Sequence, residues 1–177
     1  PRESLAKLAR TAGVKVHMGR WPQIAATVGR APVVLSTHVM YDIQQPTPFL
    51  QAMHAAAQRR VVIEVTQAHP WAHLGPLYQR FHDLDRPTGP TAADLAAVIT
   101  QATAITPQTH PWTRNGSTYD SVTALADQTA RMLCLPPDPE VIEELEELVA
   151  AAGTVLPDGR IRLADAMVVT LWWDTDG

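Results

Sequence analysis

The sequence predicts an α/β protein with a mostly parallel, Rossmann-like sheet. Three apolar runs rich in β-branched residues predict strands over 14–18, 33–37 and 61–66. Helical segments separate the runs, so the strands are expected to be parallel. Because ligands bind beyond the carboxyl ends of the strands in such a sheet, we expect a site where the residues that follow the three runs meet in one crevice.

Composition limits the class of protein. The chain has 177 residues, of which 46% are hydrophobic and 18% charged, which predicts a single globular domain over 1–177. The net charge is -4 and the basic residues are scattered, so no nucleic-acid partner is expected. No apolar stretch approaches the ~20 residues that span a bilayer, and no membrane partner is expected. The single cysteine, Cys134, fits a cytoplasmic location and a small buried apolar role.

The first half of the chain predicts a βαβ unit. Leu5, Leu8 and Ala9 indicate one face of a helix over 3–12, and residues 20–30 form a loop with at most one helical turn. The run at 33–37 is continuously apolar, as expected for a strand covered on both faces. The next helix covers about 47–58, with Thr47 as its cap and Pro48 at its first position.

The second half is predominantly helical. Thr91 with Asp94 predicts a capping box, and Asp138 with Pro139 opens a helix whose glutamates form a solvated face. A short strand is expected near 103–110, and 160–173 predicts either one long final strand or a bent pair. Helices are expected over 72–82, from Thr91, over 120–133 and from Asp138 to about 152.

Three segments carry a resemblance to a known family. They are Gly13-Val14 with Gly19-Arg20-Trp21-Pro22, then residues 32–42, then residues 59–66. Together they resemble the second half of a class I S-adenosylmethionine-dependent methyltransferase, of the actinobacterial small-molecule type. The likeness runs from about residue 3 to residue 174. It implies a Rossmann-like methyltransferase sheet with an antiparallel C-terminal edge strand, lacking the first two strands. The family's Gly-rich cofactor loop has no counterpart here, so this chain is expected to be one part of such a protein.

The resemblance implies a cofactor site. Gly19, Arg20 and Trp21 would border the adenine of S-adenosylmethionine, and Thr37, His38 and Val39 would lie beside its amino-acid end and the transferred methyl group. His38 is the expected catalytic base, because histidine is the side chain that exchanges protons near neutral pH. Two plainer interpretations stay open: Trp21 anchors a loop, and His38 is a hydrogen-bonded structural residue.

The expected acceptor side is made of Tyr41, Asp42, His69 and Trp71. Asp42 also fits a cap on the loop toward the next helix, and aromatic side chains at this spacing are more often core. Glu64 interrupts an apolar strand, so it faces the crevice or pairs with a neighbour. His69 and His73 have the spacing of a zinc pair, but no acidic ligand lies between them, and no metal is expected.

The function expected on these grounds is methyl transfer from S-adenosylmethionine to a small-molecule methyl acceptor. Two alternatives belong to other classes: a non-catalytic, dimerising methyltransferase-like subunit, and a nicotinamide-dependent oxidoreductase. A homodimer is expected if the edge of strand 33–37 is open, because an unpaired strand edge invites pairing with another chain.

Overall fold

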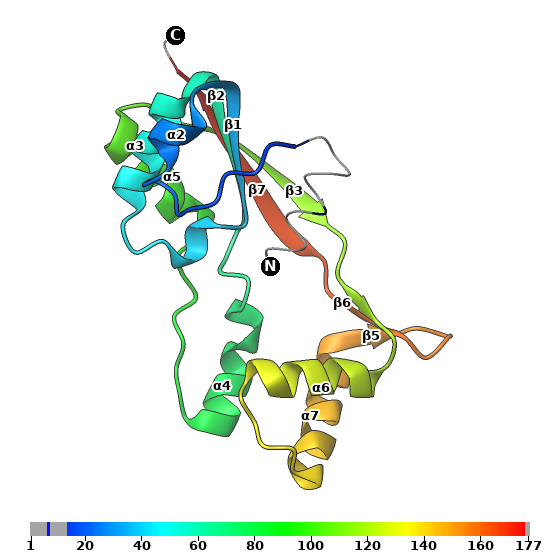
Figure 1. The fold of residues 1–177 in the computed structure, drawn as a ribbon. Helices are drawn as coiled ribbons and strands as arrows, with labels where there is room; N and C mark the ends of the chain where they lie inside the picture. Colours follow the sequence, from blue (N-terminus) through cyan, green and yellow to red (C-terminus); the bar gives the residue numbers. More distant parts are fainter. Residues whose placement is uncertain (1–6, 8–13, 176–177) are drawn as a thin grey trace. The chain divides into compact units, whose positions relative to one another are not determined.

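The computed structural model describes residue 7 and residues 14–175, and the helix predicted over 3–12 lies outside these except for Lys7. The described chain contains a four-stranded sheet in the order β1-β2-β7-β3 and a three-stranded sheet in the order β4-β6-β5 (Figure 1). The strands are β1 (Ala31–Thr37), β2 (Ala57–Thr66), β3 (Gln108–Arg114), β4 (Thr118–Tyr119), β5 (Gly153–Val155), β6 (Ile161–Leu163) and β7 (Ala166–Asp174). The helices are α2 (Ala25–Val28), η1 (Met40–Asp42), α3 (Pro46–Ala56), η2 (Ala72–Leu74), α4 (Gly75–His82), α5 (Ala92–Thr103), α6 (Val122–Met132) and α7 (Pro139–Ala152). The α/β class is therefore confirmed.

The predicted βαβ unit is formed by β1, α3 and β2. The two strands are neighbours in the sheet, and α3 connects them, which is the connection that parallel pairing requires. Helix α3 buries Phe49, Leu50 and Met53 as the apolar spacing predicted. Its cap differs from the prediction: Gln45 is the N-cap and Pro46 begins the helix. Helix α3 therefore begins at Pro46 and not at Pro48. The fixed φ of a proline suits the first helical position, and its missing N–H is no loss there.

The last strand, β7, runs antiparallel to β2. The N–H of Gln67 donates to the carbonyl of Met167, and the N–H of Thr175 donates to the carbonyl of Arg59, so the partner number falls as the residue number rises. The predicted antiparallel C-terminal strand is thus present, and the bent-pair alternative is correct, with β6 and β7 as its halves. Its place differs in one respect, because β7 lies between β2 and β3 and the edge belongs to β3.

The chain divides into two compact units. The first contains the described residues up to Ile63, then Ala96–Gln108 and the chain from Leu171. Its core consists of side chains from α3, β2, α5 and β7 that are almost fully buried: Leu50, Met53, Val61, Ile63, Ile99, Leu171 and Trp173. Within this unit Arg60 pairs with Asp174 through two hydrogen bonds, of 2.6 and 3.0 Å.

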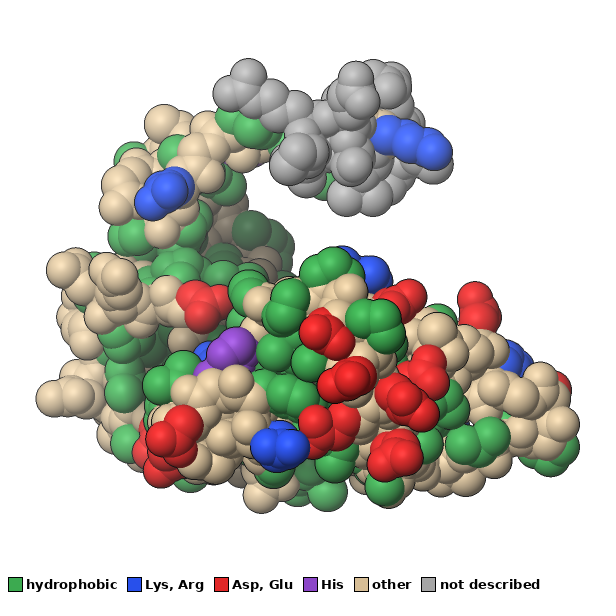
Figure 2. Space-filling view, turned by 90° about the horizontal axis from the view of Figure 1, so that it is seen from below, with side chains coloured by type: hydrophobic (Ala, Val, Ile, Leu, Met, Phe, Trp, Pro, Cys, Tyr) green, Lys and Arg blue, Asp and Glu red, His purple; other side chains and the backbone are tan. Residues whose placement is uncertain are grey.

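The second unit comprises Glu64–Leu95 and Thr109–Thr170. Helices α6 and α7 and strand β6 share one core, made of Leu125, Ala126, Ala130, Leu133, Leu145, Val149 and Ile161. Leu77, Tyr78 and Phe81 of α4 pack against it. The predicted caps hold here: Asp138 accepts from the N–H of Glu140, and Asp94 accepts from the N–H of Thr91. Acidic side chains gather on the face shown in Figure 2, and Glu140, Glu143 and Glu147 of α7 are exposed, as a solvated face requires.

Two predicted strands differ from the structure. Residues 14–18 form no strand, and Val14 and Met18 are 49% and 60% exposed. A five-residue run in which apolar and polar residues alternate forms a strand only when another strand pairs with it. No strand of the described chain does so. The strand expected near 103–110 begins only at Gln108 because α5 continues to Thr103.

Cys134 is exposed, whereas the sequence suggested a buried position. It follows α6 with φ 54°, in the left-handed region. The N–H of Cys134 donates to the carbonyl of Arg131, and the N–H of Leu135 donates to the carbonyl of Ala130. This pair of bonds is a Schellman motif, and its left-handed position turns the residue away from the helix. In the described part of the chain, no helix combines the length and the apolar character needed to cross a membrane.

Candidate active site

The end of β1 carries the predicted base in an uncommon backbone conformation. His38 has φ 53°, a left-handed value that few non-glycine residues adopt. Its ring stacks on that of Tyr41, with centroids 6.4 Å apart and planes at 17°, and His38 Nδ1 lies 3.2 Å from Tyr41 Oη. The structure therefore brings together two residues that the sequence assigned to different roles, the base and the acceptor side.

The neighbours of His38 are accessible. Thr37 and Val39 are both exposed, and Val39 is 46% exposed. Asp42 is exposed at the end of η1. It does not cap α3, whose N-cap is Gln45 without a side-chain cap bond. This segment can thus present a hydroxyl, an imidazole, a phenol and a carboxylate to a ligand.

The loop before α2 is anchored through Trp21. The indole Nε1–H of Trp21 donates to the carbonyl of Phe49 at 3.2 Å, and the two rings meet edge to face at 6.3 Å. These two contacts anchor the loop, as the plainer interpretation of Trp21 expects. Gly19 has φ 156°, and the space that a Cβ would need is taken by the Ile24 side chain. Glycine at 19 is accordingly required by packing, while Arg20 is exposed.

The second unit holds the other predicted acceptor residues. His69 Nδ1 accepts from the N–H of Trp71 at 3.1 Å, and the two rings are edge to face at 6.3 Å. Trp71 is 45% exposed, so it is not a core residue. Because residues 14–18 form no strand, the first of the three expected strand ends is absent. That the residues after β1 and β2 meet in one crevice stays a prediction.

His69 and His73, which have the spacing of a zinc pair, make hydrogen bonds within their own turn. His73 Nδ1 is 2.8 Å from the carbonyl oxygen of Pro70, and His69 caps the turn at Trp71. No group of three or more histidine, cysteine or carboxylate side chains suited to a metal occurs within the described ranges. Glu64 is half-buried in β2.

Three carboxylates outside the candidate site have pKa values below their usual range. A hydrogen bond from the Thr91 backbone holds the pKa of Asp94 below its usual value, and hydrogen bonds from Arg160 do the same for the pKa of Asp158. Arg60 lowers the pKa of Asp174 in the same way. These carboxylates stabilise a helix cap, a turn and a pair of strands, so their lowered pKa values indicate structural roles.

Sequence reasoning missed Arg86. In the sequence, Arg86 only follows the helix expected over 72–82 and precedes Pro87. The structure places its guanidinium carbon 4.4 Å from the ring centroid of Tyr78 and 5.8 Å from that of Trp71. The available signal was an arginine following a segment that carries Trp71 and Tyr78, but the loop conformation is what brings the three side chains together.

Comparisons with known proteins give a likeness of fold. No protein-family profile matches the sequence, and no curated protein is similar to it. The YcgJ protein of Bacillus subtilis is similar in structure, with a TM-score of 0.50 and 9% identity over 99% of this chain and 78% of that one.

Two further structures match less well. A provisionally assigned methyltransferase of Bacillus halodurans has a TM-score of 0.46 and 12% identity over 84% of this chain and 65% of that one. A provisionally assigned sarcosine dimethylglycine methyltransferase of Galdieria sulphuraria has a TM-score of 0.44 and 10% identity over 98% of this chain and 66% of that one. The chain thus spans about two thirds of the length of each of these two proteins. At 9% identity, the similarity to the YcgJ protein is one of α/β fold alone.

Proposed function

We propose that this protein takes part in methyl transfer from S-adenosylmethionine to a small molecule. Three features support the proposal: the resemblance of residues 13–66 to class I methyltransferases, the βαβ unit of β1, α3 and β2, and the final antiparallel strand β7. A fold hosts many reactions, so the residues at the strand end carry the argument.

The observation that carries it is the backbone of His38. A left-handed non-glycine residue costs of order 1 kcal/mol, and such residues concentrate at functional sites. Here the conformation sets an exposed imidazole at the end of a strand, stacked on Tyr41. An extended residue at position 38 would continue β1, whereas the left-handed one ends the strand.

The described residues fit the cofactor in part. Bound S-adenosylmethionine supplies an electrophilic methyl group, and the protein supplies position and proton handling. Thr37, His38 and Val39 are accessible to its amino-acid end. Trp21 has a ring fixed by Phe49, which gives a preformed face for adenine, with Arg20 beside it. Because Ile24 occupies the space above Gly19, that glycine serves the loop's own packing first.

The proposed base role fixes the tautomer of His38. Its Nδ1 would carry the proton and donate to Tyr41 Oη, so that the lone pair is on Nε2 and accepts the proton of the nucleophile. Tyr41 then acts as a positioning residue that holds the imidazole. Asp42, four residues after His38 in the same unit, is proposed to contact the methyl acceptor.

The test is methyl transfer from radiolabelled S-adenosylmethionine to a panel of small acceptors, with the full-length product of the gene. His38→Gln is expected to lower kcat by roughly 10²-fold or more, the usual contribution of a general base. Tyr41→Phe is expected to lower it less and to move the pH profile. His110→Gln is the matched control, because His110 is exposed on β3. Full kcat in His38→Gln would overturn the base assignment.

A second candidate function is a non-catalytic dimerising subunit. One observation favours it: β1 ends the sheet order in the described chain, and Val33 and Leu35 on one of its faces are 41% and 65% exposed. An unpaired apolar strand invites another chain. Light scattering of Val33→Lys and of the parent chain tests it. A parent dimer that becomes a monomer supports this function, and a parent monomer contradicts it.

A further inference from the structure

Arg86 lies between two aromatic side chains of the second unit. Its guanidinium carbon is 4.4 Å from the Tyr78 ring centroid and 5.8 Å from the Trp71 ring centroid. Tyr78 belongs to α4, and Trp71 precedes η2. An arginine over aromatic faces gains cation–π attraction and keeps its planar fork oriented, so less freedom is lost when a ligand binds.

The N–H donors of Arg86 are unused by the described chain. Its only interactions are with the two rings, and no hydrogen bond or ion pair to it occurs among the residues described. Other arginines differ: Arg60, Arg80 and Arg160 each pair with a carboxylate at 2.6 to 2.7 Å. The acidic residues nearest to Arg86 in the sequence form no ion pair with it. Asp83 accepts from Gln79 at 2.7 Å, and Asp85 is exposed.

The surroundings of Arg86 are held in place without it. The Tyr78 hydroxyl donates to the carbonyl of Met132 at 3.0 Å. The N–H of His69 donates to the carbonyl of Thr88 at 3.3 Å, which ties the loop after Arg86 to the turn that carries Trp71. Trp71 is nevertheless 45% exposed, so its ring offers apolar surface to an incoming molecule. An oriented cation beside an open aromatic surface is the arrangement that a small aromatic acid requires.

We propose that Arg86 binds the carboxylate of a small aromatic acid, whose apolar part contacts Trp71. The planar fork matches a carboxylate in bidentate geometry. A single guanidinium balances one negative charge, and Asp83 and Asp85 on the same loop disfavour a dianion such as phosphate. This binding site lies within the second unit and does not depend on the proposed function.

The test is an NMR titration of the full chain in the absence of S-adenosylmethionine, so that failure of methyl transfer cannot affect it. Benzoate is the probe, benzamide is its neutral counterpart, and inorganic phosphate is the dianion. The signals followed are the Trp71 indole N–H, assigned with Trp71→Phe, and the Arg86 Nε–H. Saturable shifts at both with benzoate, and much weaker ones with benzamide and phosphate, are expected.

Variants of Arg86 distinguish a role in binding the carboxylate from a role in supporting the loop. Arg86→Ala is expected to weaken benzoate binding roughly tenfold or more, the loss for a charge-assisted hydrogen-bond pair. Arg86→Lys keeps the charge without the fork and is expected to fall between. Arg131→Ala, at an exposed position of α6, is the control and should bind as the parent does. Equal shifts with benzoate and benzamide in the parent protein, or none with benzoate, would overturn the proposal. Those two outcomes are read on the parent chain, so they hold even if Arg86→Ala does not fold.

Discussion

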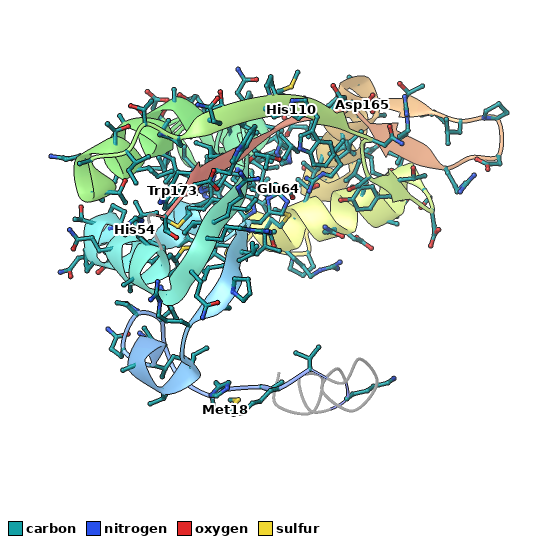
Figure 3. The ribbon with its side chains drawn as sticks, turned by 90° about the horizontal axis from the view of Figure 1, so that it is seen from above. Met18, His54, Glu64, His110, Asp165 and Trp173 are labelled. Carbon is teal, nitrogen blue, oxygen red and sulfur yellow. The ribbon has the colours of Figure 1, made fainter. Side chains whose placement is uncertain are left out.

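The indole Nε1–H of Trp173 donates a hydrogen bond to His54 Nδ1 over 3.1 Å, joining β7 to α3 (Figure 3). Trp173 is 2% exposed. An indole can only donate, so His54 must accept at Nδ1 and carry its own proton on Nε2. Residues 119 positions apart are thus joined by one bond inside the first unit.

Trp173→Phe tests this bond. The aromatic ring is retained and the donor is lost, so the free energy of unfolding should fall by about 1 kcal/mol for the hydrogen bond, with a further loss for the smaller ring. Trp172→Phe is the control, because Trp172 is only half-buried and its indole makes no hydrogen bond to the described residues. Urea unfolding measures both. Equal losses in the two variants would mean that the hydrogen bond contributes nothing.

The ion pair of Arg60 and Asp174 predicts a pH dependence. A hydrogen bond from Arg60 is the main cause of the lowered pKa of Asp174. A carboxylate whose folded pKa is depressed contributes stability above the unfolded value of about 3.9, and that contribution is lost as the pH falls through the folded pKa. The pair is exposed, so the effect on stability is small and decreases with salt.

Carbon-13 NMR titration of the Asp174 carboxyl group measures this shift directly. Arg60→Gln should raise its pKa toward the ordinary value, whereas Arg59→Gln should change it less, because Arg59 acts only through its charge. The same titration midpoint in the parent and in Arg60→Gln would contradict the assignment of Arg60 as the main cause.

Cys134→Gly should stabilise the protein. Cys134 occupies the left-handed position of the Schellman motif with φ 54°, where glycine lacks the steric penalty of about 1–2 kcal/mol that a Cβ brings. Cys134→Ala removes the thiol but keeps the Cβ and serves as the control. Urea unfolding should give a higher midpoint for the glycine variant than for the alanine variant. Equal midpoints would show that the conformation carries no strain.

Replacing two glycines by alanine should change the stability of the protein in opposite directions. A Cβ at Gly116 would collide with the backbone oxygen of Leu163, so Gly116→Ala should destabilise by roughly 1–3 kcal/mol, as overpacking does. Nothing lies within 4 Å of the Cβ position at Gly75, the first residue of α4. Gly75→Ala should therefore stabilise by about 0.4–1 kcal/mol through the unfolded chain. Thermal unfolding gives the signs, and a shift in the same direction for both would refute this account.

Local signals in the sequence identified most elements. The apolar stripe of α3, the Thr91–Asp94 capping box and the Asp138–Pro139 start of α7 are determined within one or two turns of chain, and each is present. Whether a strand is covered on both faces depends on distant segments. The apolar run of β1 predicted a strand covered on both faces, but Val33 and Leu35 are 41% and 65% exposed, so one face of β1 is open among the described residues.

In the candidate site, too, features set by local sequence were predicted and features that depend on loop conformation were not. The polar residues after β1 were identified because strand ends are visible in the pattern of apolar and turn residues. The stacking of His38 on Tyr41 and of Arg86 over Tyr78 was not, since it depends on a left-handed residue in one case and on the loop after α4 in the other. Neither loop conformation has a local signature without a glycine.

Calorimetric titration with S-adenosylhomocysteine, on this chain and on the full-length product of its gene, tests the central claim most directly. The account predicts saturable binding with one site per chain, at least in the full-length product, and weaker binding in Trp21→Ala than in the Trp112→Ala control. Absence of binding to both proteins would contradict methyl transfer and favour the non-catalytic subunit.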